Sequence, residues 1–145
     1  MENGREAIDD EELLYRRVPA STGWYDQETG ILMSQAFGPN KKWDFTGISV
    51  VRGKYKTIDE AAQGQPGKSY FIAVLCAGDL RKRDIEVVPR PDLPEADYDP
   101  AHAELPDLRA DNRKSDRTLE IQRILAEELT QRVEGPFETP GGDLP

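Results

Sequence analysis

Short runs of hydrophobic residues, separated by turn-forming residues, divide the first part of this chain into strand-like segments. The run Leu13–Val18 is stopped by Pro19, and the run Ile31–Phe37 is stopped by Gly38. Between them, Asp26–Gly30 has the composition of a hairpin turn. We therefore predict two strands joined by a loop.

Three further segments have strand-like patterns. Trp43–Val51 carries apolar side chains at both alternating sets of positions, which predicts a strand with one buried face and one partly covered face. Ser69–Cys76 is continuously apolar and rich in aromatic and branched residues, which favours a central strand buried on both sides. Ile85–Val88 predicts a short last strand, closed by Pro89.

Two segments have helical patterns. Thr57 and Glu60 have the spacing of a capping box, which predicts a short helix ending at Gly64. Residues 115–134 predict a longer helix that begins at Ser115 or Asp116 and ends before Gly135-Pro136. Its apolar positions recur at helical spacing and form one stripe. They are Ile121, Ile124, Leu125, Leu129 and Val133.

Together these elements predict a small α+β fold: a mostly antiparallel, twisted sheet with one short helix and an outlying C-terminal amphipathic helix. The predicted divisions are an acidic disordered leader at 1–12, an α+β domain at 13–110, an amphipathic helix at 111–134 and a disordered tail at 135–145. Prolines become frequent after residue 88, so the last part of the α+β domain is expected to be extended and weakly packed.

Charge divides the chain into three parts. Residues 1–12 hold six acidic side chains and one basic one, and residues 92–145 hold fourteen acidic and six basic ones. Residues 13–91 have a small positive excess, with twelve basic and eight acidic side chains. The formal net charge is −9. The acidic ends would repel DNA, which argues against a nucleic-acid partner, although the basic middle region is compatible with one.

Composition predicts a soluble, cytoplasmic protein. The longest apolar run, Tyr70–Ala77, is much shorter than a membrane span, and the amino terminus lacks the pattern of a signal peptide. The single cysteine, Cys76, excludes an internal disulfide and fits a reducing compartment. We therefore expect no membrane association, and nothing in the residue spacing calls for a metal ion or a cofactor.

Two features of the sequence resemble functional motifs but are better explained without a binding or catalytic role. Gly64–Ser69 ends in Gly-Lys-Ser like a phosphate-binding loop, but that motif needs a glycine where Ala62 stands. It also needs a strand before it and a helix after it, the reverse of the predicted order, so a solvent-facing turn is preferred. A Cys76–His102 nucleophile–base pair is disfavoured, because a thiol within so apolar a strand stays protonated.

His102 and Arg16 are the leading candidates for chemistry. His102 is the only histidine, and an imidazole can act as a general base near neutral pH. It can equally be a hydrogen-bonded packing residue where an extended segment crosses the sheet. Adjacent strand residues point to opposite faces, so Arg16 and Arg17 do not share a surface. We expect one of them to enter a pocket or pair with an acid, and the other to be solvated.

Partner binding is predicted at two places. Lys41, Lys42 and Trp43 bring basic and aromatic groups together beside Phe45, a combination that suits phosphates or stacked bases as well as a protein. The terminal-helix stripe of Ile121, Ile124, Leu125, Leu129 and Val133 would dock either on the chain's own sheet or in the groove of a partner. The proline-rich stretch before this helix makes docking on a partner more plausible, although docking on the chain's own sheet is the more common outcome.

Five short motifs make the chain resemble a group of short uncharacterised bacterial proteins. They are Leu14-x-Arg16-Arg17-Val18, Ser34-x-x-Phe37, Ile48-Ser49-Val50, Ala77-Gly78-Asp79-Leu80-Arg81 and Pro100-Ala101-His102-Ala103, within residues 13–105. The resemblance brings no known activity, but it implies a bacterial source and marks Arg16, Ser34 and His102 for testing. A fainter similarity to ADP-ribosyltransferase-like domains implies roles for Arg16 and Ser34, with Glu86 or Glu104 as the later glutamate.

The leading functional prediction is a non-catalytic protein-interaction module of a bacterial cytoplasmic complex, acting through the basic-aromatic sheet face or the terminal helix. The alternative is a small nucleotide-handling enzyme or toxin-like domain of the NAD or ADP-ribose type. An enzyme requires a pocket in which Arg16, Ser34 and His102 converge. An interaction module leaves them apart and exposes an apolar patch on residues 119–133.

Overall fold

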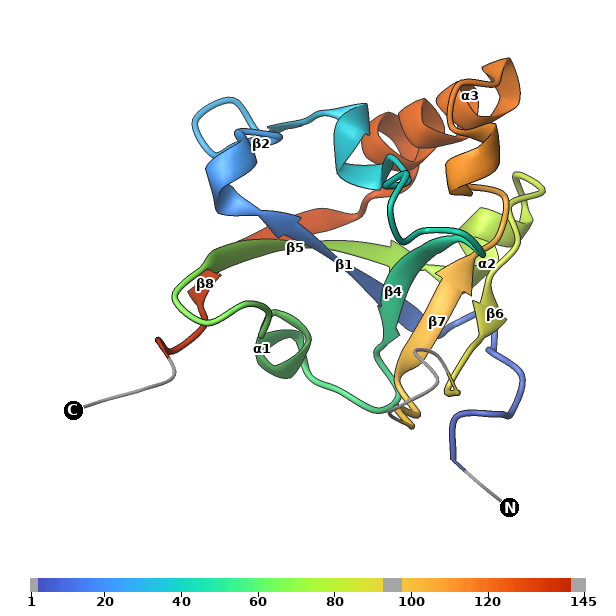
Figure 1. The fold of residues 1–145 in the computed structure, drawn as a ribbon, viewed down its shortest axis with the longest axis horizontal. Helices are drawn as coiled ribbons and strands as arrows, with labels where there is room; N and C mark the ends of the chain where they lie inside the picture. Colours follow the sequence, from blue (N-terminus) through green and yellow to red (C-terminus); the bar gives the residue numbers. More distant parts are fainter. Residues whose placement is uncertain (1–2, 93–97, 142–145) are drawn as a thin grey trace.

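The computed structural model describes residues 3–92 and 98–141 and is built around one antiparallel sheet (Figure 1). Its six strands have the order β6-β7-β4-β1-β5-β8, and every neighbouring pair is antiparallel. A separate two-stranded hairpin, β2-β3, lies above the sheet in the view of Figure 1. The predicted α+β fold class with a mostly antiparallel sheet is confirmed.

The strands are β1 (Leu13–Pro19), β2 (Tyr25–Asp26), β3 (Ile31–Leu32), β4 (Ile48–Arg52), β5 (Ser69–Cys76), β6 (Val88–Pro89), β7 (His102–Leu105) and β8 (Arg132–Glu138). The α-helices are α1 (Ile58–Ala61), α2 (Ala77–Arg81) and α3 (Asp116–Ile124), which continues as one π-helical turn, η4 (Leu125–Leu129). Three 3₁₀ turns are η1 (Ala20–Thr22), η2 (Ser34–Phe37) and η3 (Ala110–Asn112).

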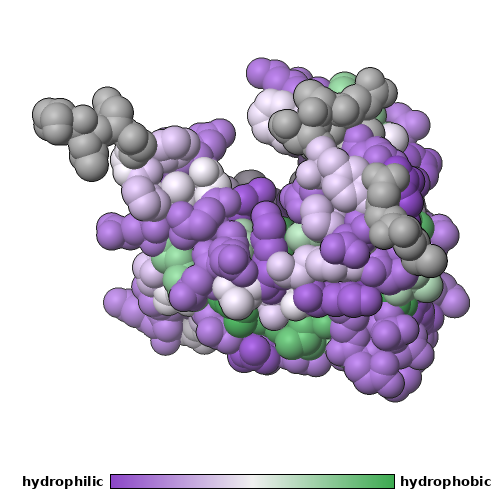
Figure 2. Space-filling model, turned by 90° about the horizontal axis from the view of Figure 1, so that it is seen from below, coloured by the Kyte–Doolittle hydropathy of each residue, from purple (hydrophilic) through white to green (hydrophobic). Residues whose placement is uncertain are grey.

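The two faces of the sheet are covered differently. The upper face in Figure 1 lies under η2, α3 and η4, and forms the main hydrophobic core, where Leu14, Ile48 and Leu75 are fully buried. The lower face carries α1 and a small apolar cluster that includes Tyr15 and Ile72. Figure 2, seen from this side, shows a largely hydrophilic surface with smaller hydrophobic areas. The lower face is therefore where polar groups meet solvent.

The best-predicted elements are those whose local pattern and tertiary role agree. β5 lies between β1 and β8 and pairs with β1 along the whole length of β1, from Leu13 opposite Cys76 to Pro19 opposite Tyr70. Apolar runs such as β5 need burial on both faces, which an interior strand supplies. The capping box of Thr57 and Glu60 is also present at the start of α1.

Three predicted strands are shorter in the structure. Of Ile31–Phe37, only Ile31–Leu32 is strand, and η2 follows. The segment predicted from Trp43 begins at Ile48, because Gly47 has a φ of 141° and a side chain there would meet the carbonyl of Leu105 at 2.6 Å. The last predicted strand is reduced to Val88–Pro89.

The terminal helix is shorter than predicted and is not outlying. It begins at the Ser115 cap, and ends because the Thr130 amide and hydroxyl both donate to the carbonyl of Leu125, at 3.0 and 2.8 Å. Residues 132–138, predicted as helix end and disordered tail, instead form β8, which pairs with the otherwise open edge of β5. An unpaired edge of so apolar a strand would be costly, which explains why the tail covers it. Residues 142–145 lie outside the described part.

The acidic segment 3–12, predicted as a disordered leader, packs along the sheet (dark blue in Figure 1). Ile8 is only 3% exposed, and Gly4 has a φ of 95° where a side chain would collide with the Pro100 backbone. The fully buried guanidinium of Arg52 holds this segment through both carboxylate oxygens of Glu12, at 2.8 and 2.9 Å. Charge complementarity thus attaches this segment to the sheet, although its composition is typical of disordered segments.

Candidate functional site

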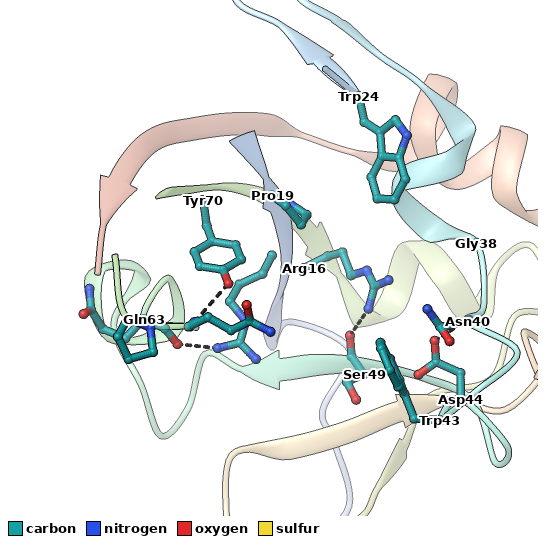
Figure 3. A pocket seen from close by; sticks show the side chains of 14 residues that line it. Arg16, Pro19, Trp24, Gly38, Asn40, Trp43, Asp44, Ser49, Gln63 and Tyr70 are labelled. Atoms are coloured by element: carbon teal, nitrogen blue, oxygen red, sulfur yellow. Dashed lines mark hydrogen bonds between the residues drawn. The ribbon is translucent and has the colours of Figure 1, made fainter. Parts of the chain in front are cut away.

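A pocket of about 710 Å³ opens beside β1 and β4, and it combines cationic, aromatic and polar side chains (Figure 3). Arg16 from β1 lies in its middle, with Trp24 above and Trp43 and Asp44 on the far side of Ser49 in this view. Its lining residues are Arg16, Arg17, Pro19, Trp24, Gly38, Asn40, Trp43, Asp44, Ser49, Gln63, Gly64, Gln65, Pro66 and Tyr70. Its volume is in the range of small-molecule sites.

Arg16 is half-buried and is held by two backbone carbonyls. Its Nε donates to the Ala36 carbonyl at 3.0 Å, and its Nη1 donates to the Ser49 carbonyl at 2.9 Å. Within residues 3–92 and 98–141, no carboxylate forms an ion pair with it. The guanidinium is therefore oriented by neutral acceptors, and its charge is left for another group to balance.

The electrostatic state of Arg16 reflects this imbalance. Burial lowers the pKa of Arg16 to about 10, the opposing charge of Asp44 raises it, and the like charge of Arg17 lowers it further. Desolvation disfavours the charged form of a basic group, whereas a nearby anion favours it. An anion bound in the pocket would consequently be stabilised by Arg16.

Arg17 reaches the same pocket from the opposite face of β1. Its Nη1 donates to the Gln63 carbonyl, and its guanidinium lies 5.9 Å from the centre of the Tyr70 ring. The side chain is exposed, as expected for the solvated member of the pair. Two adjacent arginines, one half-buried and one at the rim, thus line a single opening.

A second, smaller cavity of about 280 Å³ brings Arg16 together with His102. Arg17, Lys56 and Asp99 also line it, and Ser49 lines both cavities. Lys56 Nζ lies 3.8 Å from Asp99 Oδ2, so part of this positive charge is compensated. Two of the three residues marked by the sequence, Arg16 and His102, therefore converge, and Ser49 lies between them.

Ser34 does not join this group. It belongs to η2 on the core side of the sheet and lines neither cavity. The serine that meets His102 is Ser49, whose Oγ lies 3.0 Å from His102 Nε2. Sequence reasoning passed over Ser49 because it was one polar position within a strand. Strand alternation was the available signal, since Ser49 falls on the set that faces away from the main core.

His102 is also hydrogen-bonded on its other nitrogen. Its Nδ1 lies 2.8 Å from the Arg90 carbonyl, and its Nε2 lies 3.9 Å from Glu104 Oε2. Glu104, buried at 5% exposure, accepts a hydrogen bond from Thr46 Oγ1 at 2.7 Å and lies 3.5 Å from Arg90 Nε. These groups come from β7, the residue after β6 and the loop before β4, and the pairing of these three strands brings them together.

The stripe predicted to bind a partner is used inside the molecule. Ile121 and Leu125 are fully buried and Ile124 is 4% exposed, while Leu129 and Val133 are half-buried against the same core. Of the two docking alternatives, the structure shows the stripe on the chain's own core, covered by η2 and the sheet. Lys41, Lys42 and Trp43 do remain exposed, and Trp43 is 69% exposed at the pocket rim.

The cysteine and the Gly-Lys-Ser segment singled out in the sequence lie in surroundings that explain them without a catalytic role. The Cys76 thiol donates to the Asp10 carbonyl at 3.1 Å. Gly64–Ser69 connects α1 to β5, the order opposite to that of a phosphate-binding loop. In the described part of the chain, no three His, Cys, Asp or Glu side chains are arranged to hold a metal ion. The same part contains no helix with the length and apolar character needed to cross a membrane.

Comparisons with known proteins add no relative. No family model, no curated protein and no solved structure matches this chain.

Proposed function

We propose that this protein binds a nucleotide or a closely similar phosphorylated aromatic compound in the pocket beside β1 and β4. The single observation that carries the proposal is Arg16, a half-buried guanidinium that is oriented by two carbonyls and forms no ion pair with the described residues. Guanidinium groups match the geometry of phosphate oxygens and are the usual residues for recognising them.

The aromatic side chains that line the pocket support an aromatic base as part of the ligand. Trp24 and Trp43 border the same opening as Arg16, and Tyr70 closes it on the side of Arg17. Flat aromatic side chains beside a cationic group provide stacking for a base and charge for a phosphate. The Asp44 carboxylate disfavours a phosphate at its own end, so the phosphate is expected nearer Arg17 and the base nearer Trp43.

The distinction drawn from the sequence is met only in part. A nucleotide-handling enzyme was expected to bring Arg16, Ser34 and His102 into one cavity; Arg16 and His102 both line the cavity of about 280 Å³, whereas Ser34 does not. An interaction module based on the terminal helix needs an exposed stripe, but of its large apolar side chains in 119–133 only Leu119, at 52%, is strongly exposed.

The experiment is titration calorimetry of the full chain with AMP and with adenosine. AMP is expected to bind and adenosine to bind at least tenfold more weakly, because the phosphate contact accounts for more than about 1.4 kcal/mol. Arg16→Gln should weaken AMP binding by roughly 10- to 100-fold, the loss of a charge-assisted contact. Lys114→Gln removes the same charge at an exposed position outside the pocket and serves as the control. Equal binding of AMP and adenosine, or no binding, would refute the proposal.

A second candidate function is protein binding through the exposed loop before β4. Trp43 and Phe45 are 69% and 64% exposed, and Lys41 and Lys42 beside them are exposed as well. Large exposed aromatic residues next to basic ones are typical of interaction sites for acidic partners. A Phe45→Ser variant separates the two functions, because Phe45 does not line the pocket and its loss should leave AMP binding unchanged.

A further inference from the structure

The hydrogen bonds of His102 define which of its nitrogens carries the proton. Nδ1 lies 2.8 Å from the Arg90 carbonyl, which accepts hydrogen bonds and donates none, so Nδ1 is the protonated nitrogen. In the neutral ring Nε2 then has a free lone pair, and the Ser49 hydroxyl, 3.0 Å away, donates to it. This is the protonation pattern that a general base needs toward a serine nucleophile.

The pair is held rigidly and still has access to ligand. Ser49 and His102 lie on neighbouring strands, β4 and β7, where Val51 is opposite His102 and Ser49 is opposite Glu104. The His102 side chain is 16% exposed, and Ser49 borders both the small cavity and the larger pocket. A site built on paired strands keeps its geometry better than one on loops.

The surroundings suit both the proton transfer and the charge of a phosphoryl group. When His102 accepts the serine proton, Glu104 Oε2 at 3.9 Å from Nε2 stabilises the resulting imidazolium. On the substrate side, Arg16 is bonded to the carbonyl of Ser49 itself, and Arg17 and Lys56 line the same cavity. Cationic groups around the reacting phosphorus stabilise the oxygens of the transition state.

We infer that Ser49 is a nucleophile, with His102 as its general base, that cleaves a phosphate monoester bound in this pocket. The assignment of the phosphate ester as substrate rests on the proposed function, whereas the pairing of Ser49 with His102 does not.

In the first step the Ser49 oxygen forms a bond to phosphorus as the bond to the ester oxygen breaks. The hydroxyl proton passes to His102 Nε2, which releases it to water. The ester oxygen leaves on the opposite side of phosphorus and takes a proton from water, so that it departs as the alcohol. In the second step water attacks the phosphoserine and gives a proton to His102. The phosphorus–Oγ bond then breaks, Ser49 regains a proton from His102, and inorganic phosphate is released. Water is the only co-reactant.

The first measurement is covalent labelling of the full chain by a fluorophosphonate probe, followed by peptide mass spectrometry. Ser49 should carry the label, and Ser49→Ala should lose it. His102→Gln should slow labelling by roughly 10²- to 10⁴-fold, the usual contribution of a general base. Ser34→Ala, a serine outside both cavities, is the matched control and should label like the parent. A parent chain left unlabelled at Ser49, or labelling that is unaffected in His102→Gln, would overturn the inference.

The second measurement is release of p-nitrophenol from p-nitrophenyl phosphate and from p-nitrophenyl acetate. Turnover of the phosphate that disappears in Ser49→Ala supports the inference, whereas turnover of the acetate without the phosphate makes the reaction acyl transfer and overturns it. Calorimetry with AMP distinguishes failure of the Ser49 inference from failure of the proposed nucleotide binding. If the parent protein is not labelled at Ser49 but Ser49→Ala binds AMP normally, Ser49 is not a nucleophile and the proposed function still stands. A labelled Ser49 without AMP binding would remove the proposed function.

Discussion

Two regions of this molecule are each organised around an arginine, and they treat its charge in opposite ways. Arg52, at the end of β4, is fully buried and meets Glu12 through two hydrogen bonds, with Glu6 Oε2 at 3.2 Å. Arg16, on β1, meets two neutral carbonyls. The hydrogen bonds that Arg52 donates to Glu12 raise the pKa of Arg52, whereas burial lowers the pKa of Arg16 to about 10.

This difference distinguishes an arginine that stabilises the fold from an arginine that is available to bind a ligand. A buried charge needs a partner, because desolvation costs several kcal/mol unless an opposite charge or hydrogen bonds offset it. The Arg52 region finds its partner within the chain and thereby attaches the acidic segment 3–12. The Arg16 region leaves its charge facing a pocket, where an anionic ligand can supply the missing compensation.

The strongest test breaks the compensated region. Arg52→Met should lower the free energy of unfolding by about 3–5 kcal/mol, because Glu12 would remain buried without its partner. Urea unfolding followed by circular dichroism measures the loss. Arg132→Met, which removes an exposed pair with Glu134, is the control and should cost about 1 kcal/mol or less. Similar losses in the two variants would mean that Arg52 is no more structural than a surface arginine.

The corresponding change in the other region should barely alter stability. Arg16→Met removes a desolvated charge and, unlike Arg52→Met, leaves no carboxylate without its partner, so we expect a change of about 1 kcal/mol or less in the free energy of unfolding. The same urea experiment tests this. A loss as large as that of Arg52→Met would show that Arg16 is a structural residue and would weaken the case for a ligand.

The smallest expected effect concerns pH and the attachment of residues 3–12. The hydrogen bond from the Tyr55 hydroxyl, with Lys54 nearby, lowers the pKa of Glu6 from 4.5 to about 2. A lowered carboxyl pKa contributes stability that is present above about 4.5 and is lost as the pH falls toward about 2. The protection of the amides of residues 4–12 against hydrogen exchange, after correction for the intrinsic pH dependence of exchange, should therefore decrease across this interval. Glu6→Gln should show a smaller decrease across the same interval, and an unchanged pH dependence of protection would contradict the assignment.

Sequence reasoning succeeded where local pattern and tertiary role coincide. The apolar runs of β1 and β5, the capping box of α1 and the Ser115 cap are all present. It failed where long-range contacts override local preference. Gly135-Pro136 reads as a terminator, yet it lies within β8, because the edge of β5 needs a partner.

Only part of the candidate site could be predicted, because its assembly also depends on long-range contacts. Arg16 and His102 were singled out by their chemistry, and both line one cavity. Ser34 was marked only by the resemblance of short motifs, which carries no information on distance, and it is the strand pairing between β4 and β7 that brings Ser49 to His102. The sequence left open whether the terminal-helix stripe docks on its own sheet or on a partner, because a helical pattern is the same whether the helix packs on its own core or on another protein.

The amino-acid sequence by itself determined which segments are apolar enough to form the sheet and where its positive and negative charges are concentrated. Those properties depend on neighbouring residues, so they can be read along the chain. Only the tertiary structure decided that Arg52 is neutralised by the acidic segment while Arg16 is not, and that Ser49 meets His102. The physical reason is that compensation of a charge and orientation of a hydroxyl depend on groups tens of residues away, which approach only when the strands pair.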